Sequence, residues 1–393
     1  MNRFVKTALA IAVAGSAAHA GTGGNEWAAL DSEISGLAST LKPSQDSTGW
    51  SVLLRAVFSY SADDIATGGG NNPDTSGFNF NDADAAFWGN QGAYKWRLAV
   101  DIDDNDAGAA AGGHNAIVLE DAWVGWTCSD YLDAMMGQFK PRLLHSSVVD
   151  PEKQIMIDRT VIGSALDFHD DGVAVSGSLD YFNYYAGILD GQNGHERNHM
   201  YYARGEYQIG SGAGEYEGAT GSSDQLNATI GVTVLHDDTN GDLDADGSKD
   251  NTSFLADFSG NVSQFGFGFD VAMLDNDTFL ATSPDYSNLS DSSDGTGAPL
   301  ATPTPALVLF GDSTPWSLTG SYMLNSEWEF AVRYEDLDNG DQGGPGNTVV
   351  SVGADWYKGT YSRWQAQYSI ISADGNFNDG NILEVGYSVG SSR

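Results

Sequence analysis

Apolar and polar side chains alternate one by one along much of this chain, from residue 50 onward. In the run 94–102, for example, Trp96 and Leu98 fall on one face, while Lys95 and Arg97 fall on the other. Successive side chains of a β-strand point to opposite sides, so this period of two predicts strands with one apolar and one polar face. The same alternation is clear in the runs 50–60, 327–335 and 362–370. A water-soluble β-sandwich would show it too, so alternation alone leaves two architectures open.

The lengths of the connections decide between these architectures. We predict sixteen strands, near residues 50–60, 78–88, 93–103, 115–127, 131–139, 171–180, 182–190, 199–209, 226–236, 251–259, 263–274, 316–324, 327–337, 347–356, 361–371 and 381–389. Long connections alternate with short turns, except that the connection 210–225 should be short and is not. Trp88, Trp126 and Trp316 lie near strand ends, as in the aromatic girdles of outer-membrane barrels. The sequence therefore predicts an all-β fold, a transmembrane antiparallel β-barrel of about sixteen strands, closed so that no strand edge is left unpaired in lipid.

The first 49 residues carry different signals. Residues 1–20 combine Arg3 and Lys6, a short apolar stretch and the small-residue end Ala18-His19-Ala20, which together predict a signal peptide and export to the cell outer membrane. In residues 21–49, apolar positions recur at heptad spacing between 27 and 41, which predicts a short helical or coiled-coil segment. That helix either self-associates, for example as a homotrimer, or packs singly against the barrel, which we place at 50–393.

Composition narrows the classes of partner. The chain has 54 acidic and 17 basic residues, a net charge of −37, which excludes most nucleic-acid partners. Its one cysteine, Cys128, excludes an intrachain disulfide framework, and we expect it to be a passive free thiol. The remaining expected partners are outer-membrane lipid and small hydrophilic solutes or ions.

Several short strings between residues 120 and 191 resemble one family of porins. They are Asp121–Trp126, the string Met136-Gly-Gln-Phe-Lys-Pro, Ile157-Asp158-Arg159, and the two strand-like runs 172–177 and 184–191. Together they resemble the phosphate-selective porin O/P family of the general porin superfamily. The resemblance implies a water-filled trimeric barrel that passes small anionic solutes. The chain departs from that family in having few basic residues and in a terminal strand that runs on to Arg393, so the resemblance extends to a general porin and not to a phosphate porin.

The connection 140–170 is the best candidate for a pore constriction. It is the third long connection, the one that folds into the lumen of sixteen-stranded porins, and its basic residues face Asp150, Glu152 and Asp158. Opposed charges in a narrow pore set ion selectivity through their local field. The alternative is that these charges only tie the loop to the barrel wall. We favour a constriction in which the loop meets basic strand residues as a local positive ring, formed by Lys140, Arg142, Lys153, Arg159, Arg55, Arg97 and Arg363.

Two further motifs are weaker. The string His195-Glu-Arg-Asn-His199 matches a zinc-protease pattern, but it runs straight into a predicted strand, which would separate the two imidazoles by about 13 Å. In the acidic loop 237–247, Asp242, Asp244 and Asp246 match the first ligands of a calcium loop, although the twelfth position is Ser253 and not glutamate. These three are weak calcium candidates, and we expect no metal site and no cofactor.

The favoured function is therefore a non-enzymatic one: passive diffusion of small hydrophilic solutes or ions through a trimeric outer-membrane channel. An alternative is a structural or adhesive surface barrel whose acidic loops bind calcium. An outer-membrane barrel enzyme is a third hypothesis, and the candidate histidines show no partnered pattern that favours it. The acidic excess further predicts a mild preference for cations at low salt.

Overall fold

The structure is a computed structural model, and it describes a large part of the chain in separate ranges. These ranges are 46–62, 75–103, 116–190, 199–214, 216–237, 251–274, 313–338, 347–359, 362–373 and 380–392. The predicted signal peptide 1–20, the predicted helical segment of 21–49 up to residue 45, and the calcium candidates Asp242, Asp244 and Asp246 lie outside these described residues.

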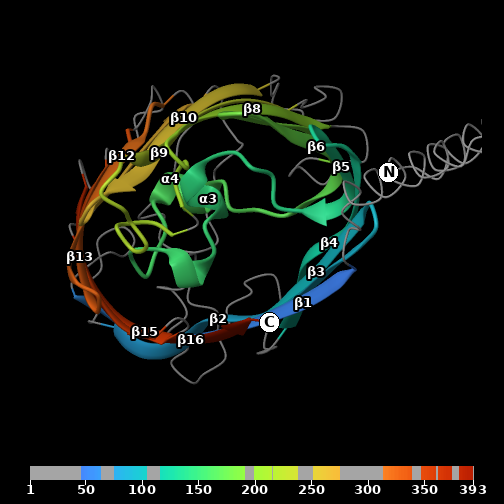
Figure 1. The fold of residues 1–393 in the computed structure, drawn as a ribbon. Helices are drawn as coiled ribbons and strands as arrows, with labels where there is room; N and C mark the ends of the chain where they lie inside the picture. The colour runs from blue at the N-terminus through green and yellow to red at the C-terminus, as the bar shows by residue number, and fades with distance from the viewer. Residues whose placement is uncertain are drawn as a thin grey trace, which may run out of the picture.

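Within the described ranges, sixteen antiparallel strands form one closed barrel (Figure 1). Each strand pairs with its neighbours in sequence, and the first strand pairs with the last, with Phe58 opposite Val385. The strands are β1 (Ser47–Ala62), β2 (Thr75–Gln91), β3 (Tyr94–Asp103), β4 (Ala116–Ser129), β5 (Leu132–Phe139), β6 (Asp170–Leu179), β7 (Phe182–Leu189), β8 (Met200–Ile209), β9 (Asn227–Asp237), β10 (Asn251–Val262), β11 (Phe265–Met273), β12 (Trp316–Asn325), β13 (Trp328–Asp336), β14 (Asn347–Gly359), β15 (Ser362–Ala373) and β16 (Gly380–Ser392).

The predicted barrel is confirmed, and each predicted strand corresponds to an observed one. Their ends differ by a few residues, most clearly in β2, predicted at 78–88 and observed at Thr75–Gln91. Backbone pairing continues beyond the stretch in which side chains alternate, so β1 also begins at Ser47, inside the segment 21–49 that we expected to precede the barrel. The wall consists of ladder hydrogen bonds that run around the whole barrel, which removes any exposed strand edge.

The two faces of the wall are inverted relative to a water-soluble β-sandwich. Outward side chains are apolar and exposed, as with Val232 on β9, which is 58% exposed, and Val332 on β13. Many inward side chains are polar, as with Arg333 and Glu335, each only 1% exposed. An apolar outer band around a polar interior is the arrangement of a barrel set in lipid. No helix among the described residues has the length and hydropathy to cross a bilayer.

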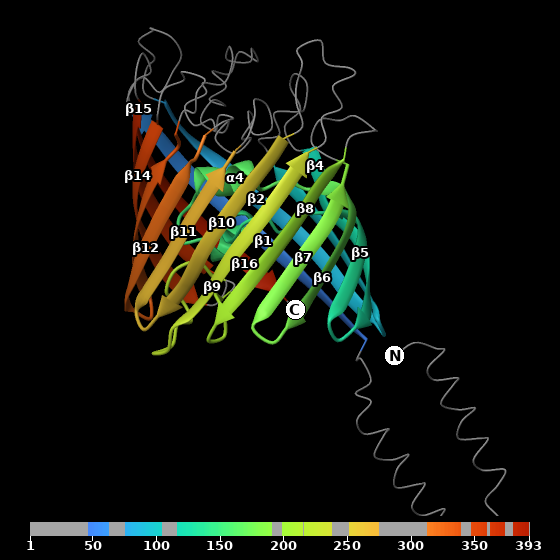
Figure 2. The same cartoon turned by 90° about the horizontal axis from the view of Figure 1, so that it is seen from above.

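The two rims of the barrel differ in the length of their connections. Tight turns join β2 to β3, β6 to β7 and β12 to β13 at one end, which we call the turn rim (Figure 2). The other end, the loop rim, carries the connection between β5 and β6, residues 140–169. This long inner loop enters the barrel and contains three short helices, α3 (His145–Val148), η1 (Pro151–Lys153) and α4 (Val161–Ala165) (Figure 1).

The unexpectedly long connection between β8 and β9 also turns inward. We call residues 210–226 the short inner loop; Glu215 within it lies outside the described residues. It starts at the turn rim and runs inside the wall, where Figure 1 shows it as a yellow-green trace. The barrel therefore holds two segments that enter from opposite ends.

Candidate pore constriction

The two ends of the long inner loop are fixed to the barrel wall by apolar packing. Leu143, Leu144, Val161, Ile162 and Leu166 are completely buried. They form one cluster with side chains of the wall, among them Leu189, Met200, Leu235 and Leu255. These wall residues belong to β7, β8, β9 and β10. Burying such side chains stabilises a structure by about 1.5–3 kcal/mol each, so this packing attaches the loop to the wall of β7 to β10.

The tip of the loop is held by polar side chains of the opposite strands. The amide oxygen of Gln367 accepts hydrogen bonds from the backbone nitrogens of Ile157, at 3.0 Å, and Asp158, at 3.4 Å. The guanidinium of Arg333 donates to the carbonyl of Asp158 at 2.7 Å. Arg55 donates in the same way to the carbonyl of Ile157 at 2.8 Å. These wall groups fix the course of the tip across the lumen.

Arg159 organises the loop from within. Its guanidinium donates to the carbonyl oxygens of Ser146, at 2.9 Å, and Val149, and it forms an ion pair with Asp167 at 2.6 Å. The next residue, Thr160, caps α4 by accepting a hydrogen bond from the backbone of Gly163 at 3.0 Å. The loop is thus a folded element with its own internal contacts.

The structure places all seven basic residues of the expected constriction on the lining of one cavity. Each has a carboxylate partner: Arg55 with Asp82, Arg97 with Asp121, Lys140 with Asp167, Arg142 with Glu206, Lys153 with Asp150, Arg159 with Asp167, and Arg363 with Asp355. Six carboxylates thus meet seven basic side chains, since Lys140 and Arg159 share Asp167, so most of the positive charge of these residues is offset by a neighbouring negative charge.

The seven residues fall into two groups by exposure. The side chains of Arg159 and Arg363 are only 5% exposed and hold loop carbonyls, as Arg363 does with Pro151 at 3.0 Å. Arg55 is buried in the same manner. The side chains of Arg97 and Arg142 are 35% and 34% exposed. Lys140 and Lys153 are intermediate. Arg55 and Arg363 thus have the contacts expected of charges that tie the loop to the wall, Arg159 holds the loop from within, and the other four present charge to the cavity.

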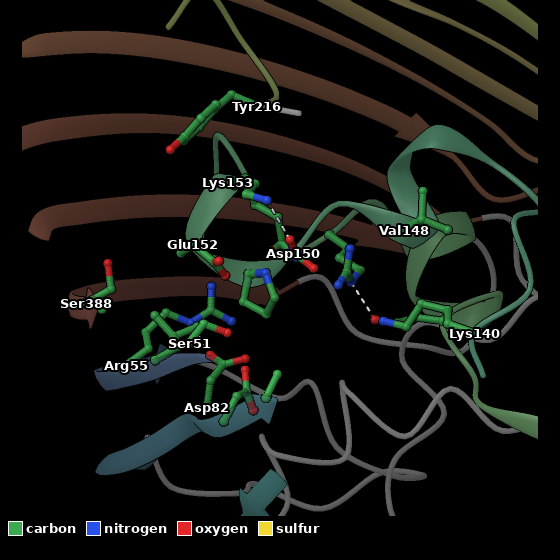
Figure 3. A pocket seen from close by; sticks show the side chains of 18 of the residues that line it. Ser51, Arg55, Asp82, Lys140, Val148, Asp150, Glu152, Lys153, Tyr216 and Ser388 are labelled. Carbon is green, nitrogen blue, oxygen red and sulfur yellow. Dashed lines mark hydrogen bonds and ion pairs between the residues drawn. The ribbon is translucent and has the colours of Figure 1, made fainter. Parts of the chain in front are cut away.

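The cavity has a volume of about 1820 Å³ and lies between the inner loops and the wall, where most lining residues come from β1 to β4 and others from β5 to β8, β15 and β16. Figure 3 shows Arg55 and Asp82 on one side of it, facing Asp150, Glu152 and Lys153 of the long inner loop. The lining continues to the turn rim, where it includes residues 325–327 and 357–359.

Acidic side chains of the wall add to the lining. Asp84 on β2, Asp101 on β3 and Glu120 on β4 bring carboxylate oxygens within 4.8 Å of one another. In the part of the chain that the structure describes, no ion pair joins Asp84 or Glu120 to a basic side chain. Sequence reasoning did not single out this group, although the same period-of-two pattern places all three on strands near the lumen.

Titratable groups of the long inner loop are shifted by their surroundings. Burial and the nearby charge of Lys140 lower the pKa of His169 to about 4, so its imidazole is neutral at physiological pH. Burial alone would raise the pKa of Asp167, but Lys140 and Arg159 hold it below its usual value. Burial and the charge of Asp150 raise the pKa of Glu152. The loop thus keeps Asp167 ionised beneath its basic residues.

Sequence reasoning missed two arginines that position the loop. Arg204 on β8 and Arg333 on β13 are both buried inside the barrel and donate to loop carbonyls, those of Leu143 and Asp158. Both lie on the polar face of an alternating strand, so their direction was predictable. Their partners were not, because the loop residues they hold are far away in the sequence.

The zinc-protease string and Cys128 form no catalytic or metal-binding arrangement among the described residues. His195 lies outside the described residues, and His199, just before β8, has its Nδ1 3.9 Å from a carboxylate oxygen of Asp190. Cys128 is exposed at the end of β4, and its sulfur lies 3.7 Å from the carbonyl oxygen of Trp126. The free thiol expected from the sequence is therefore observed.

Comparisons with known proteins bear on the fold. No family model matches the chain, and no curated protein matches it. Among solved structures, an anion-selective porin from Comamonas acidovorans aligns with 88% of this chain and 100% of its own, at a TM-score of 0.58 and 10% identity. The outer-membrane channel DcaP of Acinetobacter baumannii aligns with 88% of this chain and 97% of its own, at 0.57 and 12%.

A third solved structure is the trimer form of OmpT, an outer-membrane protein of Vibrio cholerae. It aligns with 88% of this chain and 99% of its own, at a TM-score of 0.55 and 13% identity. Identities this low show the fold alone. This chain has the fold of outer-membrane porins, and the narrower resemblance to the phosphate-selective porin O/P family stays a prediction.

Proposed function

We propose that this protein is an outer-membrane porin that lets small hydrophilic solutes and ions diffuse passively through its lumen. The observation that supports it best is the polar cavity of about 1820 Å³ inside a closed barrel whose outer wall is apolar. A folded loop narrows this cavity without filling it. The proposed activity has no chemical step and needs no cofactor.

The direct test is conductance in planar lipid bilayers. Purified, folded protein should insert and give discrete current steps in potassium chloride, and vesicles that contain it should admit small sugars. The same protein after thermal unfolding is the control, because detergent and contaminants remain while the barrel is lost. A heat-modifiable, folded barrel that gives no current steps would refute the proposal.

We further propose that the channel prefers cations. Ten acidic side chains line the cavity against eight basic ones, which are the seven residues above and Lys358. In a narrow passage with low-dielectric walls, such an excess acts on ions more strongly than it would in bulk water. A salt gradient should therefore give a reversal potential of the sign expected for cation flow, declining as salt rises. Anion preference at all salt concentrations would instead support the phosphate-porin resemblance.

The expected oligomer is a homotrimer, in line with the trimer form of the Vibrio cholerae protein of similar fold. Outward apolar side chains offer a surface for association within the membrane. The protein should run in mild detergent gels as an oligomer that becomes a monomer on boiling. Deleting residues 26–43 tests whether the heptad segment contributes. A monomer by light scattering in mild detergent would contradict the trimer.

A further inference from the structure

The short inner loop occupies a place where the barrel needs only a turn. Other connections at the turn rim consist of a few residues, such as the two between β10 and β11. This one has seventeen positions, 210–226, and five of its residues line the cavity: Tyr216, Ala219, Thr220, Gly221 and Ser222. A connection that is much longer than the fold requires, and that enters the lumen, needs an explanation.

Specific contacts hold this loop against the wall. Glu329 on β13, which is fully buried, accepts hydrogen bonds from the backbone nitrogen of Ala219 at 2.5 Å and from the hydroxyl of Thr220 at 3.0 Å. The hydroxyls of Ser321 and Tyr357 donate to the same carboxylate, at 2.7 and 3.0 Å. A buried carboxylate with four donors is a preorganised anchor, and two of those donors come from the loop.

The backbone approaches the wall so closely that only glycine fits. Gly218 has a φ of +83°, and an added Cβ would lie 2.5 Å from a carboxylate oxygen of Glu329 and 3.0 Å from the side chain of Ile155. A Cβ on Gly266 of β11 would run into the backbone of Gly218. Two facing glycines therefore allow the loop to lie directly on β11, where a side chain on either would push it into the lumen.

The short inner loop also touches the tip of the long one. The backbone nitrogen of Glu217 donates to the carbonyl of Lys153 at 3.0 Å, and its carboxylate accepts from the backbone nitrogen of Ile155 at 3.1 Å. The same carboxylate lies 3.8 Å from the guanidinium of Arg333. Glu217 thus joins the wall and both inner loops at one point. Tyr216, beside it, lies across the cavity from Arg55 and Asp82 (Figure 3).

From these contacts we infer that residues 210–226 are a second pore-narrowing loop, which supports the tip of the long inner loop from the turn rim and limits solute size. Glu217 is the positioning residue, and Tyr216 is a side chain that faces the solute. This rests on the proposed channel function. The two loops close the side of the lumen along β9 to β14, so that solutes pass between them and the wall of β1 to β4.

The first test is size selection. Deleting residues 213–222 should raise single-channel conductance and should admit larger neutral sugars, such as a trisaccharide, that pass the unaltered channel poorly. The reason is that the deletion opens the space along β13 and removes the support under residues 151–158. A deletion variant that is folded by its gel mobility, yet keeps the original conductance and sugar cut-off, would overturn the inference.

The second test does not depend on a deletion that could prevent folding. In a Cys128→Ser background, Tyr216→Cys should react with a charged methanethiosulfonate reagent and lose conductance as it does. Asp224→Cys, at the exposed turn rim, is the matched control that should react without a comparable loss. Equal responses at both positions would place residue 216 outside the solute path and overturn the assignment.

The third test concerns Glu217 itself. Glu217→Ala should increase open-channel current noise, because the tip loses its contact at Ile155. Glu217→Gln keeps an oxygen that can accept that hydrogen bond and should restore most of the quiet behaviour. Equal noise in all three proteins would refute the positioning role. If the unaltered protein forms no channels, the proposed function itself fails; if it does and these variants match it, only the second loop's role fails.

Discussion

Arg204 offers the sharpest measure of how the lumen stabilises this barrel. Its guanidinium donates to both oxygens of Asp257, at 2.6 and 3.0 Å, and to Glu206 at 2.8 Å. It also donates to the carbonyl of Leu143 in the long inner loop at 2.8 Å. The side chains of Arg204 and Asp257 are both fully buried. The substitution Arg204→Met keeps much of the side-chain volume and removes all of these donors.

The expected loss follows from that burial. Two opposite unit charges about 4 Å apart attract by about 4 kcal/mol at an effective dielectric constant of about 20. Removing one member of a buried ion pair leaves the other uncompensated and costs about 3–5 kcal/mol. We therefore expect Arg204→Met to lower the free energy of unfolding by about 3–5 kcal/mol. Most of this loss comes from the stranded Asp257.

Urea-induced unfolding in lipid vesicles, followed by tryptophan fluorescence, measures this difference. Arg97→Met is the matched control: Arg97 also forms an ion pair, with Asp121, but its side chain is 35% exposed, so a loss of about 0–1 kcal/mol is expected. The double variant Arg204→Met with Asp257→Asn should recover part of the loss, because no full charge is then stranded at residue 257. A loss below about 1 kcal/mol for Arg204→Met alone would refute the reasoning, since it would mean that the pair is solvated.

Three further predictions address the loops and the lining. Gly218→Ala should lower the free energy of unfolding by about 1–3 kcal/mol, because of the positive φ and the close contact with Glu329. Gly214→Ala should change it little, because the added Cβ would lie 3.9 Å from the backbone nitrogen of Tyr216, an ordinary contact distance; urea unfolding compares the two variants. Because the pKa of His169 is lowered from 6.5 to about 4, only the unfolded state gains a proton between these values. Stability should therefore fall as pH drops from about 6.5 to 4, and His169→Gln should remove that part of the pH dependence. Asp84→Asn combined with Glu120→Gln should shift the reversal potential toward anion preference, while the single-channel conductance keeps its order of magnitude. An unshifted reversal potential would show that this acidic group lies outside the ion path.

The sequence by itself determined the wall of the barrel. Alternation such as that of Trp96 and Leu98 against Lys95 and Arg97 has a period of two residues, and the direction of each side chain follows from the strand backbone alone. The length of each connection also follows directly from the sequence. The closed order of sixteen strands and the inward direction of Arg333 could therefore be predicted without the structure. What surrounds the wall, lipid outside and water inside, then fixes which face is apolar.

Only the tertiary structure decided what fills the lumen. The long inner loop depends on partners such as Gln367 and Arg333, more than 170 positions away from the residues they hold, and no local pattern encodes such pairs. The sequence marked the connection 210–225 as too long for a turn, but its inward course depends on Glu329 and on two facing glycines, Gly218 in the loop and Gly266 on β11. The sequence also predicted a ring of positive charge, and the structure places its seven basic residues beside carboxylates of the same loop or of a neighbouring strand, apart from Arg142, which pairs with Glu206 on β8. Which carboxylate each basic side chain meets depends on the register of neighbouring strands and on the folded course of the loop, and no local sequence pattern encodes either of these.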